Sequence, residues 1–465
     1  MQERENLRMS VPHTAIPMGY SRPPEQGAVV KSQVTRSRSL SEGCKMVAAA
    51  PPPLTWTEYL KLLVLKKALL VYITLAEVSF SSLALGRSLR CVKRAVNCYS
   101  LVSKLGCPED ASAVAPGVSF ALGVAGDVYL ACVSRWSEMP VYQEQFNTGL
   151  VAETQIAKEV EKYTHELDRD WSIKQPRDIQ EAMELAASCY TRALDLLDGG
   201  EEATSLQRRL ANVENELGVF YMNQATALVQ RVSGEEEEEA ALHPAMAGAK
   251  DLFRTSRKYL ERGIARFESI HDHANTALLL SNCGRLSRLA GHSVGLQQEQ
   301  EQQEYGGEEE QHYRAALDCY RQALAILGSR KVSPDIWDSV TWELSSTLYT
   351  VGTLLQDHAP LSSQSREEVE REVTEHMSQA LRYMDLEGRG PRQAVFLARA
   401  AVIHHRLASL YHHSYRSCAE ACQRRKKLRQ LSDLHYVKAI GLFQNSDRWP
   451  IFPLYISFLI ERLPS

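Results

Sequence analysis

Apolar side chains recur at helical spacing from Leu54 to about Phe443, and the alternation of apolar and polar positions that is typical of strands is nearly absent. This stretch is rich in Leu and Ala, which favour helices. It is also too long for one compact domain with a single core. The pattern therefore predicts an all-α chain built from many helices.

The two ends of the chain do not share this pattern. Residues 1–53 carry Pro, Ser and Arg without periodic apolar positions. Such a segment buries too little apolar surface to offset its ordering entropy, so we expect a disordered N-terminal arm. Residues 444–465 contain Pro450 and Pro453, which interrupt a helix, and we expect an atypical tail there.

Within residues 54–443 the helices come in pairs of a repeated kind. In the first pair, Leu75 and Ala76 place a bulky and a small residue on one helix, while Ser88, Val92 and Ala95 place small, bulky and small residues on the next. Small residues let two antiparallel helices approach closely, and the large ones fill the grooves beside them. The spacing resembles that of the tetratricopeptide repeat (TPR).

The pattern recurs five more times, which predicts a TPR-like solenoid of about six helix pairs. The matching residues of the later pairs are Leu122, Ala125, Gly126 and Tyr129 with Ala186, Tyr190 and Ala193; Leu217, Gly218 and Tyr221 with Ser256, Leu260 and Gly263; Leu280, Cys283 and Gly284 with Ala316, Tyr320 and Ala323; Trp342, Ser345, Ser346 and Tyr349 with Val373, Met377 and Ala380; and Leu407, Ala408 and Tyr411 with Ser432, Tyr436 and Ala439.

Only the first pair has the usual TPR spacing between its helices. The small residues of the two helices are 12 residues apart in the first pair and 60, 38, 32, 27 and 24 apart in the others. We therefore expect long insertions within the repeats, at the turn between paired helices, where a loop lengthens at little entropic cost. The acidic run Gly234–Ala240 and the Gln/Glu tract Gln297–Gln311 are expected to be solvated loops.

Several longer stretches resemble the C-terminal repeat region of the erythroid differentiation-related factor family. They are Tyr59–Tyr72, Gly126–Leu130, Tyr142–Phe146, Trp337–Ser362 and Ile403–His412. The resemblance covers roughly Leu54–Phe443. It implies a nuclear protein that promotes erythroid differentiation and globin-gene transcription. Members of that family carry a large N-terminal portion where this chain has a short lead.

Composition and charge exclude some classes of function. The formal net charge is −4, whereas domains that grip nucleic acid are usually visibly basic. We therefore expect no direct sequence-specific binding to nucleic acid. The longest apolar run, Ala68–Val78, is far shorter than the ~20 residues that span a bilayer, so we expect no membrane segment. Ten scattered cysteines without a framework indicate reduced thiols in an intracellular protein.

Two motifs invite a catalytic or metal-binding interpretation, and neither is favoured. Gly291–Gly295 reads GHSVG, but a nucleophile elbow needs a strand before Ser293. We expect a helix-terminating loop there instead, with Gly291 as the C-cap. A second cluster has spacings that fit no structural zinc pattern: it consists of His404, His405, His412, His413, Cys418 and Cys422. We expect no catalytic residue, no cofactor, no metal and no enzymatic activity.

The candidate partner-binding groove follows from the solenoid, because the first helices of the pairs line its concave surface. The groove positions are Glu77, Asp127, Asn215, Arg285, Glu343 and His405. A clamp for chaperone C-termini needs paired Lys and Asn side chains in the groove. Neither these positions nor the positions four residues away from them on the same helices supply such pairs. We expect the partners to be other proteins, with transcription factors among the candidates.

A dense basic cluster lies between the two helices of the sixth pair. Arg424, Arg425, Lys426 and Lys427 form a candidate nuclear import signal, and a solvated loop or a helix start is the alternative. The sequence thus supports two hypotheses with one fold. One is a nuclear scaffold for transcriptional control, and the other is a cytoplasmic TPR adaptor that binds peptide motifs of other proteins.

Overall fold

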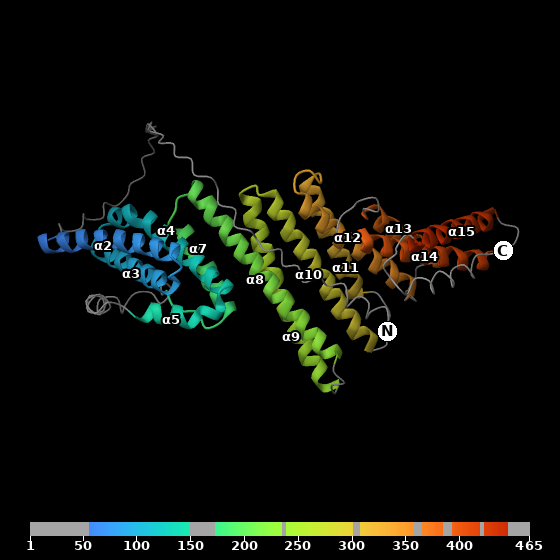
Figure 1. Cartoon of the computed structure of the whole chain (residues 1–465), viewed down its shortest axis with the longest axis horizontal. Helices are drawn as coiled ribbons and strands as arrows, with labels where there is room; N and C mark the ends of the chain where they lie inside the picture. The colour runs from blue at the N-terminus through green and yellow to red at the C-terminus, as the bar shows by residue number, and fades with distance from the viewer. Residues whose placement is uncertain are drawn as a thin grey trace, which may run out of the picture. The chain divides into compact units, whose positions relative to one another are not determined.

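A computed structural model describes residues 55–148, 173–234, 239–300, 307–357, 365–384, 393–418 and 423–444 of the chain. These residues belong to one compact unit within residues 53–465. Figure 1 shows that the described part is built from helices and the turns between them, without strands. The prediction of an all-α repeat fold is confirmed. The expected arm 1–53 and almost all of the expected tail 444–465 lie outside the described residues.

The helices follow one another along the chain in a regular order. They are α2 (Trp56–Ser81), α3 (Leu85–Leu105), α4 (Pro108–Ser134), the 3-10 turn η1 (Trp136–Glu138), α5 (Met139–Asn147), α7 (Ile179–Asp195), α8 (Glu201–Gly234), α9 (Glu239–Ser269), α10 (His273–Gln300), α11 (Gly307–Leu327), α12 (Pro334–Asp357), α13 (Arg366–Arg382), α14 (Gln393–Ser417) and α15 (Gln423–Gln444).

The dominant contacts between helices join six pairs. These are α2 with α3, α4 with α7, α8 with α9, α10 with α11, α12 with α13 and α14 with α15. They are the six pairs that the sequence predicts. The second helix of each pair also packs against the first helix of the next, so the pairs form a continuous array.

Small residues on the first helix of a pair receive large side chains from the second. A Cβ atom added to Gly126 would lie 2.5 Å from the ring of Tyr190, and one added to Gly284 would lie 2.6 Å from the ring of Tyr320. Both tyrosines are fully buried. The close packing of these two pairs therefore depends on the absence of a side chain at the glycine.

A buried serine serves the same junction in other pairs. The Ser88 hydroxyl donates to the carbonyl oxygen of Ala76 at 2.8 Å. The Ser432 hydroxyl donates to the carbonyl oxygen of Ala408 at 3.1 Å. The small residues in the sequence pattern thus act in two ways: they admit the neighbouring helix, and as serines they also bond to it.

The insertions differ from the expected loops. The long spacing in the third pair is absorbed by long helices, because α8 runs to Gly234 and α9 begins at Glu239. Only residues 235–238 of the acidic run lie outside the described part. The first residues of the Gln/Glu tract, Gln297–Gln300, likewise belong to α10. The expectation of a loop is wrong for these flanks, since extending a helix satisfies backbone hydrogen bonds that a loop would leave to solvent.

The insertion of the second pair contains a further helix, α5, which packs against α3. Tyr142 of α5 is buried, and its carbonyl oxygen lies where a Cβ of Gly86 in α3 would be. Residues 149–172 lie outside the described part. The described portion of this insertion is therefore attached to the repeat array.

The GHSVG motif is not a helix-terminating loop, which corrects our expectation. Residues 291–295 lie inside α10, and Gly291, Ser293 and Gly295 are all buried. A Cβ on Gly295 would lie 2.3 Å from the Glu309 carboxylate of α11, and one on Gly291 would lie 3.1 Å from the Cβ of His312. The glycines are needed for the close approach of α11. Ser293 lies within a continuous helix, not on a strand-to-helix elbow.

Helix α4 is the one described helix that is long and apolar enough to cross a bilayer by length and composition alone. Most of its apolar window is buried in the array, where α4 packs against α2, α3 and α7. A core helix surrounded by other helices passes the same test. The apolar character of α4 is accounted for by this packing.

Candidate partner-binding surfaces

The six predicted groove residues lie on the first helices of the six pairs, one on each of α2, α4, α8, α10, α12 and α14. Their accessibility differs. Glu77 is exposed, Asn215 is buried, and the other four are half-buried. The contacts of these side chains show what each is placed to do.

Asp127 joins the second and third pairs. It accepts a hydrogen bond from the hydroxyl of Tyr190 at 2.6 Å and pairs with the guanidinium of Arg209 in α8 at 2.9 Å. Burial raises the pKa of the Asp127 carboxyl above its ordinary value, and Arg209 opposes that shift. The carboxylate is held by groups of its own chain from two neighbouring helices.

Asn215 joins the third and fourth pairs. Its side-chain oxygen accepts from the amide of Asn282 in α10 at 2.8 Å. Beside it, buried Glu214 pairs with Arg266 of α9 at 2.8 Å, and burial raises the pKa of the Glu214 carboxyl. These polar contacts set the registry between α8, α9 and α10.

Glu343 belongs to a polar cluster that joins the fourth, fifth and sixth pairs. It pairs with Arg288 of α10 at 2.9 Å. Nearby, the Arg399 guanidinium of α14 lies 4.4 Å from the ring centre of Trp342 and donates to the hydroxyl of Ser346. The pKa of Arg399 is lowered by burial. This cluster fastens α10, α12 and α14 to one another.

Three of the six predicted groove residues, Asp127, Asn215 and Glu343, are thus engaged in contacts between repeats. Glu77 is exposed on α2, and Arg285 is half-buried on α10. The His405 ring lies 6.2 Å from the ring of Tyr436 in α15. The structure does not gather the six into one site. Their role as partner contacts stays a prediction.

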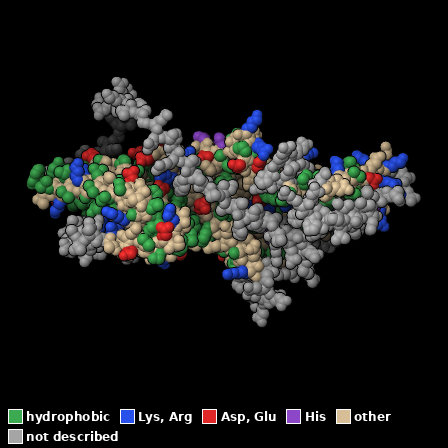
Figure 2. Space-filling view, viewed as in Figure 1, with side chains coloured by type: hydrophobic (Ala, Val, Ile, Leu, Met, Phe, Trp, Pro, Cys, Tyr) green, Lys and Arg blue, Asp and Glu red, His purple; other side chains and the backbone are tan. Residues whose placement is uncertain are grey.

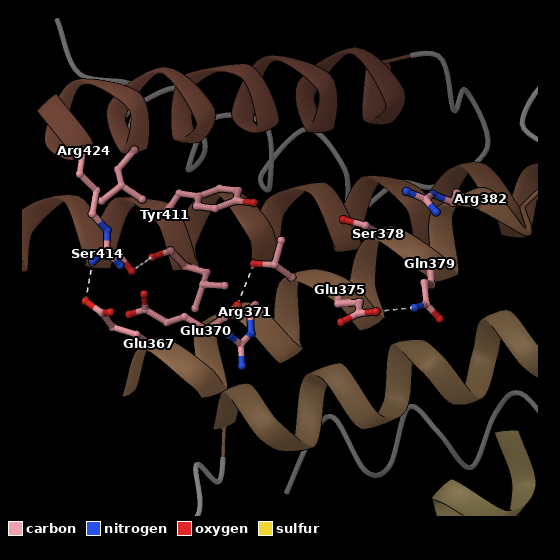
Figure 3. A pocket seen from close by; sticks show the side chains of 13 residues that line it. Glu367, Glu370, Arg371, Glu375, Ser378, Gln379, Arg382, Tyr411, Ser414 and Arg424 are labelled. Atoms are coloured by element: carbon pink, nitrogen blue, oxygen red, sulfur yellow. Dashed lines mark hydrogen bonds and ion pairs between the residues drawn. The ribbon is translucent and has the colours of Figure 1, made fainter. Parts of the chain in front are cut away.

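A cleft that the sequence did not indicate lies between α13, α14 and α15, with a volume of about 430 Å³ (Figure 3). Helix α13 packs closely on α12 but only weakly on α14, which leaves the cleft open. Glu367, Glu370 and Glu375 line it from α13, and Tyr411 and Ser414 line it from α14. Arg371 and Arg382 of α13 line it as well, so a wall of mixed charge faces a wall that carries an aromatic ring.

The carboxylates of the cleft come from the first turns of α13. The segment Arg366–Glu375 holds five glutamates and two arginines. Glu370 pairs with Arg366 at 3.2 Å, and Glu375 accepts from the amide of Gln379 at 3.0 Å. A signal for this surface was present in the sequence as the run REEVEREVTE. It is hard to recognise because a charged stripe on a helix usually has no partner.

The basic cluster forms the first turn of α15, so its predicted place between the helices is corrected to the start of the second one. Arg424 lines the cleft and pairs with Glu367 of α13. The Arg425 guanidinium lies 4.8 Å from the ring centre of Tyr415, while Lys426 and Lys427 are exposed. Further along α15, Tyr436, Ala439 and Phe443 are buried in a cluster with Ala401 and Ala408 of α14.

The histidine and cysteine cluster is dispersed over α14 and its end. His404 is buried and its Nδ1 lies 2.9 Å from Nδ1 of His435 in α15. Burial lowers the pKa of both rings to about 4. Among the described residues, no group of three or more His, Cys, Asp or Glu side chains is arranged to hold a metal ion, and Cys422 lies outside them.

Comparison with known proteins places the chain in a family. A family model for the TPR repeats of erythroid differentiation-related factor 1-like proteins matches residues 206–461. Human erythroid differentiation-related factor 1 is 33% identical over 464 residues, which cover 96% of this chain and 36% of that protein. The mouse protein is 32% identical over 96% of this chain and 36% of its own length. The chain thus spans about a third of the length of these relatives.

Among solved structures, the S. pombe nuclear import adaptor Nro1 aligns with 86% of this chain and 99% of its own, at a TM-score of 0.36 and 11% identity. The family match extends to residue 461 and so includes most of the segment that the sequence pattern set apart as an atypical tail. The paired helices, their small-on-large packing and the similarity over nearly the whole chain lead to one conclusion. The chain belongs to the family of erythroid differentiation-related factor 1-like TPR repeat proteins.

Proposed function

We propose that this chain is a non-enzymatic protein–protein interaction scaffold that acts in the nucleus in the control of erythroid differentiation and globin-gene transcription. TPR repeats are interaction modules, and the relatives carry the erythroid differentiation name. The observation that carries the scaffold role is the open cleft beside α13, where glutamates and arginines of this helix face Tyr411.

The chemistry of the cleft defines the kind of partner it fits. Lysine or arginine side chains of a peptide would face Glu370 and Glu375. An apolar side chain of the same peptide would contact Leu410, Tyr411 and Leu428 on the opposite wall. A short helix or extended segment fits both walls if it places cations opposite these two glutamates and one apolar anchor opposite Tyr411.

Proximity labelling of this chain in erythroid precursor cells tests the proposal. We expect enrichment of chromatin proteins and transcription factors, and its loss with Glu370→Gln combined with Glu375→Gln. The matched control is Glu261→Gln with Glu268→Gln, which removes two exposed carboxylates from α9. A partner set unchanged by the cleft variant would refute binding at the cleft. Tight sequence-selective DNA binding by the purified chain would refute the scaffold role.

A cytoplasmic TPR adaptor is the second candidate. The observation that favours it is the attachment of Arg424 to Glu367 and of Arg425 to Tyr415, since an import receptor would have to compete with these contacts. Fractionation distinguishes the two. Exclusion from the nucleus, with trafficking or cytoskeletal proteins as neighbours, would support the adaptor.

A further inference from the structure

A second groove lies between α9, α10 and α11, with a volume of about 380 Å³. Helices α9 and α11 each pack on α10, which lines the groove between them. The groove shares no lining residue with the cleft beside α13, and none of the six predicted groove residues lines it. We call it the basic groove, and the residues that characterise it are Lys250, Arg254 and Arg257 of α9, Leu286 and Ala290 of α10 and His312 of α11.

The floor of the basic groove is apolar. Phe253, Leu286 and Ala290 are buried in one apolar cluster, and Met246 packs against it. Val294 is half-buried beside them. An apolar side chain of a ligand would be removed from water on this floor.

The rim of the basic groove is positively charged. Lys250 and Arg254 are exposed, and Arg257 is half-buried. Among the residues that line the groove, Glu308 is the one carboxylate, so three cations against one anion leave an excess of two positive charges. An excess of one sign of charge around a groove attracts a ligand of the opposite sign.

Two of the cations have weak partners of their own chain. Lys250 pairs with Glu308 at 2.8 Å, and Arg254 pairs with Asp251 at 2.5 Å. All four side chains are more than half exposed. Solvent screens such pairs, so an incoming carboxylate competes with them at little cost.

Arg257 is the cation best placed to hold an anion. It makes no ion pair within the described part of the chain, and its guanidinium donates to the neutral hydroxyl of Ser287 at 3.0 Å. Because Arg257 is half-buried, its charge is screened less than that of an exposed side chain.

His312 shows that Arg257 and Lys250 act on the same part of the groove. Burial lowers the pKa of this ring, and the charges of Arg257 and Lys250 lower it further, while Glu308 opposes the shift. The imidazole is therefore neutral at pH 7, and a neutral imidazole can donate one hydrogen bond to a carboxylate.

We propose that the basic groove binds an acidic segment of a partner protein, with one large apolar side chain on the floor and flanking carboxylates paired with Arg257 and Lys250. Alternation of acidic and apolar residues is typical of the activation domains of transcription factors. The groove selects the charge opposite to that attracted by Glu370 and Glu375. The proposal therefore goes beyond the cleft beside α13 and does not depend on that cleft having a partner.

A nucleic acid fits the basic groove less well than an acidic peptide does. On the face drawn in Figure 2, Lys and Arg side chains are dispersed over several helices and are not gathered in one large patch. A phosphate backbone is held by a long basic surface. It would also leave the apolar floor of the groove without a contact.

Fluorescence anisotropy of the full chain with a labelled synthetic peptide tests the proposal. The probe alternates aspartate with leucine and phenylalanine, and we expect saturable binding that weakens as the salt concentration rises. Lys250→Gln with Arg257→Gln should weaken binding by about tenfold or more. A second probe, with asparagine in place of aspartate, should bind the unaltered chain as weakly as the first probe binds this variant.

The matched control is Lys258→Gln with Arg262→Gln, which removes two exposed cations of α9 that do not line the groove. It should retain the affinity of the unaltered chain. Far-UV circular dichroism verifies that each variant is folded. Equal affinity in the two double variants, or no binding of the acidic probe to the unaltered chain, would overturn the proposal. So would a duplex DNA oligonucleotide that binds more tightly than the peptide and loses affinity in the Lys250 and Arg257 variant.

Discussion

The hydroxyl of Ser256 in α9 donates a hydrogen bond to the carbonyl oxygen of Gly218 in α8 at 2.7 Å. Ser256 is fully buried, and a Cβ on Gly218 would lie 2.7 Å from the side chain of Leu260, one turn further along α9. The small residue of one helix thus has two partners on the other. The same geometry recurs where Ser88 meets Ala76 and where Ser432 meets Ala408.

Ser256→Ala should destabilise the α8–α9 pair by about 1 kcal/mol, because it removes one buried hydrogen bond without adding volume. Hydrogen exchange read out by mass spectrometry should show faster exchange in α8 and α9 than in α14 and α15. The control is Thr255→Ala, since the Thr255 hydroxyl bonds within its own helix to Asp251. Equal exchange in the two variants would contradict a role for the bond between helices.

Gly284→Ala should cost more, about 2 kcal/mol or above, because the new methyl group would overlap the buried ring of Tyr320. In an ordinary helix position the same change is stabilising by up to ~1 kcal/mol. Gly441→Ala in α15 is the matched control, since nothing lies within 4 Å of its Cβ position. Urea unfolding should move the two midpoints in opposite directions. A neutral Gly284→Ala would show that the packing of α10 on α11 is looser than the structure has it.

The packing pattern was predictable because it is local in sequence. Tyr190, Tyr320 and Tyr436 were assigned to their pairs from spacing alone, and each is buried where the pattern places it. The lengths of the insertions could also be predicted from the sequence, but whether they form loops or helices could not. A charged stretch is compatible with either a loop or a solvated helix end, and α8 and α9 take the second solution.

The groove residues and the cleft show the opposite case. Asp127 pairs with Arg209 and Glu343 pairs with Arg288, and both arginines lie on other helices. The spacing of the repeats along the sequence does not show that these side chains meet. The cleft likewise depends on how far α13 separates from α14. That separation is a property of tertiary packing, and the sequence of α13 reveals only its charge.

The pair of rings His404 and His435 should make the α14–α15 pair sensitive to acid. Burial lowers both pKa values from 6.5 to about 4, so the unfolded chain binds protons more readily than the folded chain. The stability that the neutral rings contribute is full above about pH 6.5 and is lost as the pH falls towards about 4. Lys438 adds to the effect, because it also disfavours the charged form of both rings.

Thermal unfolding between pH 7 and pH 5 should therefore show a smaller loss of stability in His435→Phe than in the unaltered chain. The substitution retains an aromatic ring but removes one titrating group and the Nδ1 contact. His413→Gln is the control, because His413 is exposed on α14 and should leave the slope with pH unchanged. An unaltered slope in His435→Phe would contradict the assignment of acid sensitivity to this pair.

If the basic cluster is an import signal, its exposed lysines should carry most of the recognition, because Arg424 and Arg425 are held by Glu367 and Tyr415. Lys426→Ala with Lys427→Ala should shift the chain from nucleus to cytoplasm without changing its thermal stability. Imaging of a fluorescent fusion measures the ratio between the compartments. Lys258→Ala with Arg262→Ala, two exposed cations on α9, is the control and should not alter that ratio.

Freeing Arg424 should act in the opposite direction. Glu367→Gln removes the carboxylate that holds this guanidinium, so a receptor no longer competes with α13 for it. We expect nuclear accumulation of Glu367→Gln to exceed that of the unaltered chain. Added to Lys426→Ala with Lys427→Ala, the same substitution should restore little of the lost nuclear accumulation. A rise of equal size in both backgrounds would place the import determinant outside α15 and leave the cluster as an ordinary solvated helix start.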